Sequence, residues 1–205
     1  IMQRLNEIDE NDILIYCDAG HSINKNGKER LDFYIESLMK SEYGIISFQW
    51  HGDKDRKWIT NEMMNYFKLD INNPHMLSGP MSANTLIMKK CDHLKKILKI
   101  YEKLMDDNVY LISDVYNSNK QHSNYNETRH DQSAFGLIRK IHGSLVFKDN
   151  TWAPKFGKDA PPFIKKESFW GTRKRLDKTR GKDYVKENKE SSKKLKKYLM
   201  DNNMI

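Results

Sequence analysis

Cysteine is scarce in this sequence, which holds only Cys17 and Cys91 among its 205 residues. Neither belongs to a Cys-x-x-Cys pair, so the chain lacks the disulfide framework of a small secreted domain. The seven histidines also lack the His-Glu-x-x-His spacing of a zinc protease. We therefore expect two reduced, buried thiols and no zinc motif.

Long apolar runs are equally absent from the chain. No segment approaches the roughly 20 apolar residues that a membrane-spanning helix needs. The first residues also lack the apolar stretch and the small-residue cleavage site of a secretory signal. These absences predict a cytoplasmic location and no transmembrane segment.

Basic residues outnumber acidic ones only towards the C-terminal end of the chain. Residues 165–205 hold 14 Lys and Arg against 6 Asp and Glu, which accounts for the whole net charge of +8. We predict a body over residues 1–164 and a basic C-terminal extension over residues 165–205. Clustered Lys and Arg attract nucleic acid and anionic membranes, but acidic side chains interrupt this cluster and it lacks the aromatic platforms of single-strand binders. A solvated helix is the favoured interpretation, and nucleic acid is not an expected partner.

Apolar, β-branched runs alternate with helical patterns along the body. The runs predict strands at 13–17, 45–50, 82–88 and 144–148. Helical spacing of apolar residues predicts helices at 31–38, from Thr60, from Asp92 as N-cap to 105, and from Asp131. Residues 109–112 fit either a strand or a helix, and 183–200 carry a weak helical pattern. This alternation predicts an α/β fold with ligands beyond the carboxyl ends of its strands.

The first segment with candidate chemistry is Tyr16-Cys17-Asp18-Ala19-Gly20-His21, at the end of the first predicted strand. A strand that ends in a carboxylate, followed by a glycine, lets a ligand approach the backbone closely. A carboxylate there could hold a divalent cation against a diphosphate, because Mg²⁺ and Mn²⁺ prefer oxygen ligands and often share them with substrate phosphates. The structural alternative is that Asp18 only caps a turn.

The second segment is Arg129-His130-Asp131-Gln132-Ser133, at the start of a predicted helix. Free N–H groups and the helix dipole favour anions at such a position. Capping by itself would explain Asp131 and could also explain Ser133, but it leaves the adjoining His130 and Gln132 without a role.

Together the two segments resemble GT-A-type nucleotide-sugar glycosyltransferases. The resemblance covers roughly residues 8–175 and runs through the Tyr-x-Asp-Ala-Gly strand end, a Trp-Ile-Thr segment, a small-residue strand and the Arg-His-Asp-Gln-Ser helix start. It implies a layered, GT-A-like α/β sheet flanked by helices, with residues 1–164 as the catalytic domain. It also implies an enzyme that moves a sugar from a nucleotide-sugar donor to a glycan or protein acceptor.

The resemblance implies donor-binding, metal-binding and acceptor-binding residues. The metal, Mn²⁺ or Mg²⁺, would be held by Asp18 and His21. An acceptor sugar would stack on Trp58. The donor would contact Asp18, Ala19, Gly20, Ser82, Ala83, Asn84 and Arg129.

The same resemblance implies a catalytic group made of His130, Asp131 and Gln132. If the reaction inverts configuration, Asp131 is the best candidate general base, a role that contributes about 10²–10⁴-fold in enzymes. If the reaction retains configuration, Asp131 would position or stabilise the donor sugar instead.

Two features depart from the GT-A pattern. Gly20 stands where the second carboxylate of the usual Asp-x-Asp motif is expected, so cationic side chains such as Arg129, Arg173 and Arg175 would supplement or replace a metal. The chain also starts only 17 residues before Asp18, whereas GT-A folds place a nucleotide-binding strand and helix further upstream. Either an N-terminal portion is missing or the fold is shortened.

Two interpretations from other classes stay open. The chain could be a non-catalytic sugar- or nucleotide-binding domain that lacks a full metal motif. It could also bind nucleic acid through residues 165–205, in which case binding would depend strongly on salt and not on Asp18.

Overall fold

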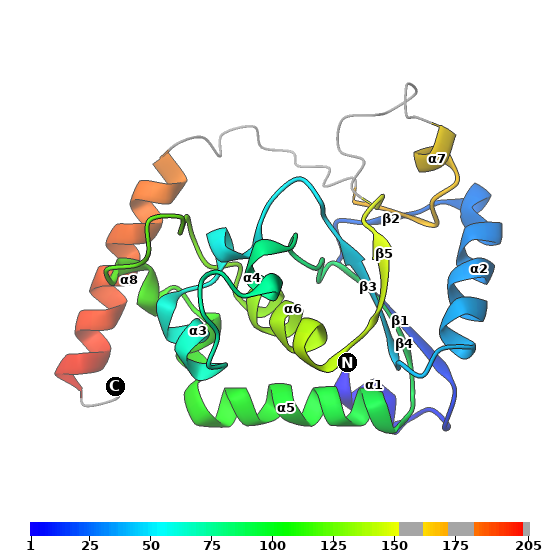
Figure 1. The fold of residues 1–205 in the computed structure, drawn as a ribbon, viewed down its shortest axis with the longest axis horizontal. Coiled ribbons are helices and arrows are strands. Elements are labelled where there is room, and N and C mark those ends of the chain that lie inside the picture. Colours follow the sequence, from blue (N-terminus) through cyan, green and yellow to red (C-terminus); the bar gives the residue numbers. More distant parts are fainter. Residues whose placement is uncertain (152–161, 172–182, 203–205) are drawn as a thin grey trace.

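The computed structural model describes residues 1–151, 162–171 and 183–202, which form a mixed α/β fold (Figure 1). The main sheet has the strand order β1-β4-β3-β5, with β1 at Ile13–Cys17, β3 at Ile45–Gln49, β4 at Thr85–Lys89 and β5 at Leu145–Lys148. A second, two-stranded sheet pairs β2 (Ser22–Ile23) with β6 (Phe169–Trp170). The prediction of an α/β sheet flanked by helices is confirmed.

Eight α-helices and four 3₁₀ helices are found among the described residues. The α-helices are α1 (Met2–Asn6), α2 (Lys28–Met39), α3 (Asn61–Tyr66), α4 (Pro74–Leu77), α5 (Asp92–Asn108), α6 (Asp131–His142), α7 (Pro162–Lys165) and α8 (Asp183–Asp201). The 3₁₀ helices are η1 (Lys25–Gly27), η2 (Asp55–Trp58), η3 (Val109–Ile112) and η4 (Val115–Ser118). The ambiguous segment 109–112 is therefore neither strand nor α-helix.

The strand directions gather several chain segments at one edge of the main sheet. β4 runs antiparallel to both β1 and β3, and β5 runs parallel to β3. The carboxyl ends of β1, β3 and β5 therefore lie at the same edge as the amino end of β4. We call this the carboxyl edge.

The predicted third strand begins later than expected. β4 starts at Thr85, so Ser82, Ala83 and Asn84 precede it. The Ser82 amide donates to the Phe48 carbonyl at 2.8 Å, and Met81 forms an isolated antiparallel bridge with Gln49, so this segment lies beside the end of β3 but outside the regular β4 ladder. The three small residues consequently lie at the carboxyl edge.

Helices cover both faces of the main sheet because side chains alternate along its strands. On one face, Ile46, Phe48 and Ile87 pack with Tyr34 and Leu38 of α2. Figure 1 shows α2 on this side of the sheet, with α5 and α6 on the other. The sheet is therefore the middle layer of the fold.

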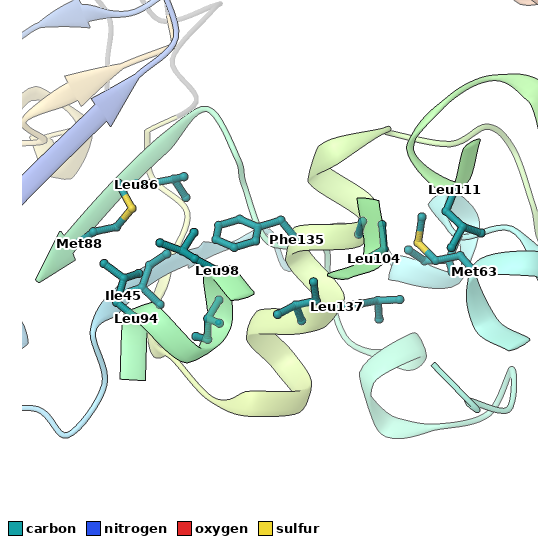
Figure 2. Packing of buried hydrophobic residues seen from close by; sticks show 14 of the residues in the cluster. Ile45, Met63, Leu86, Met88, Leu94, Leu98, Leu104, Leu111, Phe135 and Leu137 are labelled. Atoms are coloured by element: carbon teal, nitrogen blue, oxygen red, sulfur yellow. The ribbon is translucent and has the colours of Figure 1, made fainter. Parts of the chain in front are cut away.

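The larger core lies between the sheet, α5 and α6. Figure 2 shows Ile45, Leu86 and Met88 of the strands near Leu94 and Leu98 of α5. The cluster extends from α5 and α6 to α3 and η3, and α6 is buried along most of its length. Residues in this part of the cluster are Met63, Leu104, Leu111, Phe135 and Leu137. This packing fixes where α6 begins.

One prediction about a helix start is wrong. Cys91, not Asp92, is the N-cap of α5, and Asp92 is its first helical residue. The predicted helix start at Asp131 is confirmed by α6. Its N-cap is His130, with no side-chain capping bond, so the alternative that Asp131 caps this helix does not hold. Both carboxylates lie in the first turn, where the helix dipole favours negative charge. The predicted helix near Thr60 is α3, and the Thr60 side chain caps it by accepting from the Met63 amide.

Residues 162–171 and α8 pack at opposite sides of the molecule (Figure 1). The first segment buries Glu167, Ser168 and Phe169 against β2, η1 and α2. The helix α8 packs on η4. Arg173 and Arg175 lie outside the described residues, and the division at residue 164 stays a prediction.

Candidate functional site

A cleft of about 270 Å³ opens at the carboxyl edge. Its wall comes from the ends of β3 and β5, the segment before β4, and the start of α6. The lining residues are Trp50, Pro80, Ser82, Asn84, Arg129, Gln132 and Asp149. Four of the seven, Ser82, Asn84, Arg129 and Gln132, are predicted site residues from two segments far apart in the sequence.

Asp18 lies beside this cleft because β1 ends next to the start of β4. The Asp18 amide donates to the Asn84 carbonyl at 2.9 Å. A backbone turn follows, in which the His21 amide donates to the Asp18 carbonyl at 2.9 Å. Ala19 and Gly20 in this turn are exposed.

The Asp18 carboxylate interacts with a tyrosine instead of capping the turn. Tyr16 donates its hydroxyl to Asp18 Oδ1 at 2.8 Å. This hydrogen bond, together with burial and the nearby charges of Asp18 and Asp131, raises the pKa of Tyr16 to about 12. Tyr16 therefore stays a neutral donor at physiological pH, and the carboxylates of Asp18 and Asp131 both act on it.

The segment before β4 is ordered by its own side chains and by Arg139 beneath it. Ser82 Oγ and Asn84 Oδ1 are 2.6 Å apart, which requires the serine hydroxyl to donate. Arg139 Nη2 donates to the Ser82 carbonyl at 2.9 Å, and Nη1 donates to Ser47 Oγ on β3 at 3.2 Å. Arg139 thus ties the cleft segment to α6 and to the sheet.

Arg139 is a fully buried cation. Burial lowers the pKa of its guanidinium to about 10, so it stays charged at neutral pH. Its neighbour Lys140 is neutralised by Asp55, with Lys140 Nζ 2.6 Å from Asp55 Oδ2 and both side chains almost fully buried. The interior behind the cleft segment therefore carries net positive charge, which favours an anionic group in front of it.

The start of α6 is built by Ser133 and an unusual backbone at His130. Ser133 Oγ accepts from the Arg129 amide at 2.9 Å and donates to the Trp58 carbonyl at 2.6 Å. His130 has φ 53° and ψ −122°. Such a conformation costs a residue with a Cβ of order 1–3 kcal/mol and is found mainly at functional sites.

Asp114 holds the His130 side chain in this position. His130 Nε2 lies 2.9 Å from Asp114 Oδ1. The His130 side chain is 45% exposed, and Arg129 and Gln132, close to it in the chain, line the cleft. The pair therefore lies beside the cleft and not in the core.

The two tryptophans of the site differ in exposure. Trp58 is buried, and the Arg129 guanidinium lies 4.1 Å from the centroid of its ring. A sugar could stack on that face only after Arg129 moves, and the acceptor role of Trp58 stays a prediction. Trp50 is 49% exposed and lines the cleft directly. An aromatic wall is therefore present without any rearrangement.

The residues around Asp18 do not form a metal site made by the protein alone. No group of three His, Cys, Asp or Glu side chains suitable for a metal occurs within residues 1–151, 162–171 and 183–202. A protein carboxylate plus substrate phosphates can hold Mg²⁺, but here the Asp18 carboxylate already accepts from Tyr16. The metal role of Asp18 and His21 stays a prediction.

Trp50 and Asp149 were not predicted as site residues, although their position directly after a strand is the same feature that pointed to Asp18. Each follows directly after a strand whose carboxyl end lies at the same edge: Trp50 after β3 and Asp149 after β5. Asp149 Oδ1 accepts from the Thr151 amide and hydroxyl at 2.9 and 2.7 Å, which orders the loop after β5. Arg139 and Asp114 carried no comparable signal, because their importance comes from tertiary contacts.

The cysteines are only partly buried, not buried as predicted, and both are free thiols.

None of the described helices is long and apolar enough to cross a membrane. Comparison with protein families, with curated proteins and with solved structures finds no significant match to the chain. Any function of the chain must therefore be inferred from the site itself.

Proposed function

We propose that the chain is a glycosyltransferase that binds a nucleotide-sugar donor at the carboxyl edge and transfers its sugar to a hydroxyl of a glycan or protein acceptor. One observation carries the proposal. Ser82 and Asn84 line one cleft together with residues at the start of α6, which is distant in the sequence, and Asp18 lies beside this cleft through its hydrogen bond to Asn84. Their convergence is what the resemblance to GT-A enzymes requires.

The chemistry of the lining suits a sugar bound near an anion. Ser82, Asn84 and Gln132 provide hydroxyl and amide groups for sugar hydroxyls, and Trp50 provides an apolar face. Arg129 lies on the rim, and the buried cation Arg139 lies behind the wall. Preorganised positive charge of this kind stabilises the diphosphate that leaves during transfer.

The size of the cleft suggests which part of the donor it holds. A volume of about 270 Å³ is just below the roughly 300–1,000 Å³ of typical ligand pockets. It has room for a sugar ring but not for a whole nucleotide-sugar. The nucleotide would then lie outside the cleft, next to the exposed residues Ala19 and Gly20.

The test is a panel of UDP-glucose, UDP-galactose, UDP-N-acetylglucosamine and GDP-mannose, each with and without Mn²⁺. Saturation-transfer NMR measures binding, and release of the nucleoside diphosphate measures turnover. Turnover by the wild type should be lost in Asp18→Asn and Asp131→Asn. It should be unchanged in Asp106→Asn, which alters an exposed carboxylate on α5.

The outcomes separate the proposed enzyme from a binding module. Binding without turnover, lost in Asp18→Asn, would favour the non-catalytic sugar- or nucleotide-binding domain. If a folded protein neither binds nor hydrolyses any donor of the panel, the proposed function is wrong for this chain.

A further inference from the structure

The Asp114–His130 pair fixes the tautomer of the histidine ring. An ionised carboxylate can only accept hydrogen bonds, so His130 Nε2, 2.9 Å from Asp114 Oδ1, must carry the hydrogen. The other ring nitrogen, Nδ1, then has a free lone pair. It has no protein hydrogen-bond partner within residues 1–151, 162–171 and 183–202. His130 is therefore arranged as a proton acceptor.

Asp114 is itself held in place by neighbouring residues. Asn117 Nδ2 donates to Asp114 Oδ1 at 2.6 Å. The amide oxygen of Asn117 accepts in turn from the Tyr125 hydroxyl and from the Thr128 amide. A second layer of hydrogen bonds therefore limits how far the carboxylate can turn away from the ring.

The His130 backbone has an unusual conformation that accompanies the contact of its ring with this carboxylate. Its φ of 53° is one that residues other than glycine rarely adopt. The Thr128 hydroxyl accepts from the His130 amide at 3.3 Å, and the Ala134 amide donates to the His130 carbonyl at 3.3 Å. Arg129 and Gln132, close to His130 in the chain, both line the cleft.

Asp131 is less well placed for the same task. Its carboxylate is exposed in the first turn of α6, and no side chain among the described residues orients it by a hydrogen bond. It acts electrostatically on Tyr16 beside Asp18, which points to the donor side of the site. The better oriented proton acceptor is therefore the histidine.

We propose that His130 accepts the proton of the acceptor hydroxyl during transfer, and that Asp114 is the positioning residue that fixes its ring. This inference rests on the proposed function. The acceptor oxygen bonds to the anomeric carbon, and the bond from that carbon to the diphosphate oxygen breaks with its electron pair on the diphosphate. The hydroxyl proton passes to His130 Nδ1, and the Asp114 carboxylate stabilises the resulting imidazolium.

The first experiment reads the tautomer without any ligand. Long-range ¹H–¹⁵N correlation spectra of ¹⁵N-histidine-labelled protein distinguish a protonated Nε2 from a protonated Nδ1. The His130 signals are identified by their loss in His130→Gln. We expect Nε2–H in the wild type and an altered tautomer population in Asp114→Asn, because the asparagine amide can donate to Nε2. Wild-type His130 with its hydrogen on Nδ1 would overturn the proposal.

The second experiment measures kcat and KM for the panel nucleotide-sugar that the wild type turns over. Asp114→Asn and His130→Gln should lower kcat by about 10²–10⁴-fold, while KM for the donor stays within about twofold because ground-state binding is unaffected. Asp106→Asn is the matched control and should change neither value. A kcat in Asp114→Asn equal to that of the wild type, or a loss that appears only in KM, would show that the pair is structural.

The two failures can be told apart. If the wild type turns over no donor, the proposed function and the proton-accepting role fall together, whatever the spectra show. If donor turnover needs Asp18 and Asp131 but survives His130→Gln, the proposed function stands and this inference is wrong.

Discussion

Gly79 lies against the backbone at the end of β3, where no side chain fits. A Cβ built there would be 1.6 Å from the Trp50 carbonyl oxygen and 2.7 Å from its carbonyl carbon. Backbone atoms cannot rotate away, so Gly79→Ala should lower the free energy of unfolding by about 3 kcal/mol or more. Urea denaturation measures this loss.

The control for this prediction is a glycine inside α6. A Cβ at Gly136 would meet its nearest neighbours at 3.8 Å, an ordinary contact. Gly136→Ala should therefore add about 0.5–1 kcal/mol, because alanine loses less backbone entropy in a helix. Equal effects of the two substitutions would contradict the close approach at Gly79.

The buried pair of Lys140 and Asp55 predicts an asymmetry between a buried and an exposed lysine. Burial lowers the pKa of Lys140 and raises that of Asp55, so both charged forms depend on each other. Lys140→Met leaves the Asp55 carboxylate uncompensated and should cost about 3–5 kcal/mol of stability. Lys103→Met, which breaks an exposed pair with Asp107, should cost at most about 0.5 kcal/mol. Thermal and urea unfolding of both variants check this.

Glu167 predicts a pH dependence of stability. Burial raises the pKa of its carboxyl group, although hydrogen bonding from Tyr34 and the charge of Arg30 oppose the shift. The folded protein therefore binds this proton more tightly than the unfolded chain does. The resulting stabilisation is complete below the usual pKa of 4.5 and is lost as the pH rises through the raised value.

Glu167→Gln removes this titration. Its free energy of unfolding, relative to that of the wild type, should rise as the pH increases from acidic to neutral. Glu36→Gln, on the exposed side of α2, controls for the change in net charge. A difference between Glu167→Gln and the wild type that is constant or falls with pH would contradict the raised pKa.

At the scale of single elements, the end of α3 carries a residue that costs stability. Lys68 has φ 54°, and the Leu69 amide donates to the Met64 carbonyl at 2.9 Å across this turn. Glycine adopts such a φ without a steric penalty. Lys68→Gly should therefore raise the free energy of unfolding by about 0.5–1 kcal/mol.

The same substitution at the end of α2 should have the opposite sign. Lys40 is the C-cap of α2 with φ −82°, so Lys40→Gly only increases the entropy of the unfolded chain. Chemical denaturation of the two variants side by side isolates the backbone effect from the loss of one positive charge.

Local sequence patterns predicted the main-sheet strands well because each strand is short, apolar and bounded by polar residues. They could not predict the direction of β4, since a five-residue strand does not encode which neighbours it pairs with. The N-cap of α5 was misplaced by one residue, because an acidic residue suits the first turn as well as the N-cap. The helix from Asp131 begins at the predicted residue. The short strands β2 and β6 carry too few residues for any periodicity.

At the scale of the whole molecule, α8 links the C-terminal region to the site through η4. Leu199 of α8 is buried, α8 packs on η4, and Lys196 of α8 contacts Asn119, which directly follows η4. Because Asp114 and Asn117 belong to this same segment, loss of α8 should loosen the support of His130.

Leu199→Asp should detach α8, because a buried carboxylate without a partner is costly. The expected result is faster hydrogen exchange of the amides at residues 115–118, measured by mass spectrometry. Leu195→Asp places the same charge on the same helix at a position that is 42% exposed. In this variant, hydrogen exchange at residues 115–118 should stay at the wild-type rate. Equal exchange in both variants would show that η4 does not depend on this contact.

The position of Asp18 at the carboxyl edge could be predicted from the sequence, because the strand before it is a clear apolar run. Gln132 and Arg129 reached the same cleft only because α6 is clamped by the core residues Phe135 and Leu137. Contacts of this kind join residues far apart in the chain, so composition and spacing do not reveal them. Asp114 and Arg139 belong to the part of the site that only tertiary structure could identify.

The position of Cys17 provides a chemical reporter for the site. It is the last residue of the edge strand β1, directly before Asp18, and burial raises the pKa of its thiol. Alkylating reagents react with the thiolate, so modification of Cys17 depends on how often the end of β1 opens. A ligand that joins Asp18 to Asn84 across β1 and β4 would stabilise the closed state. In a Cys91→Ser background, the rate of alkylation would thus report occupancy of the site for any candidate ligand, before its reaction is known.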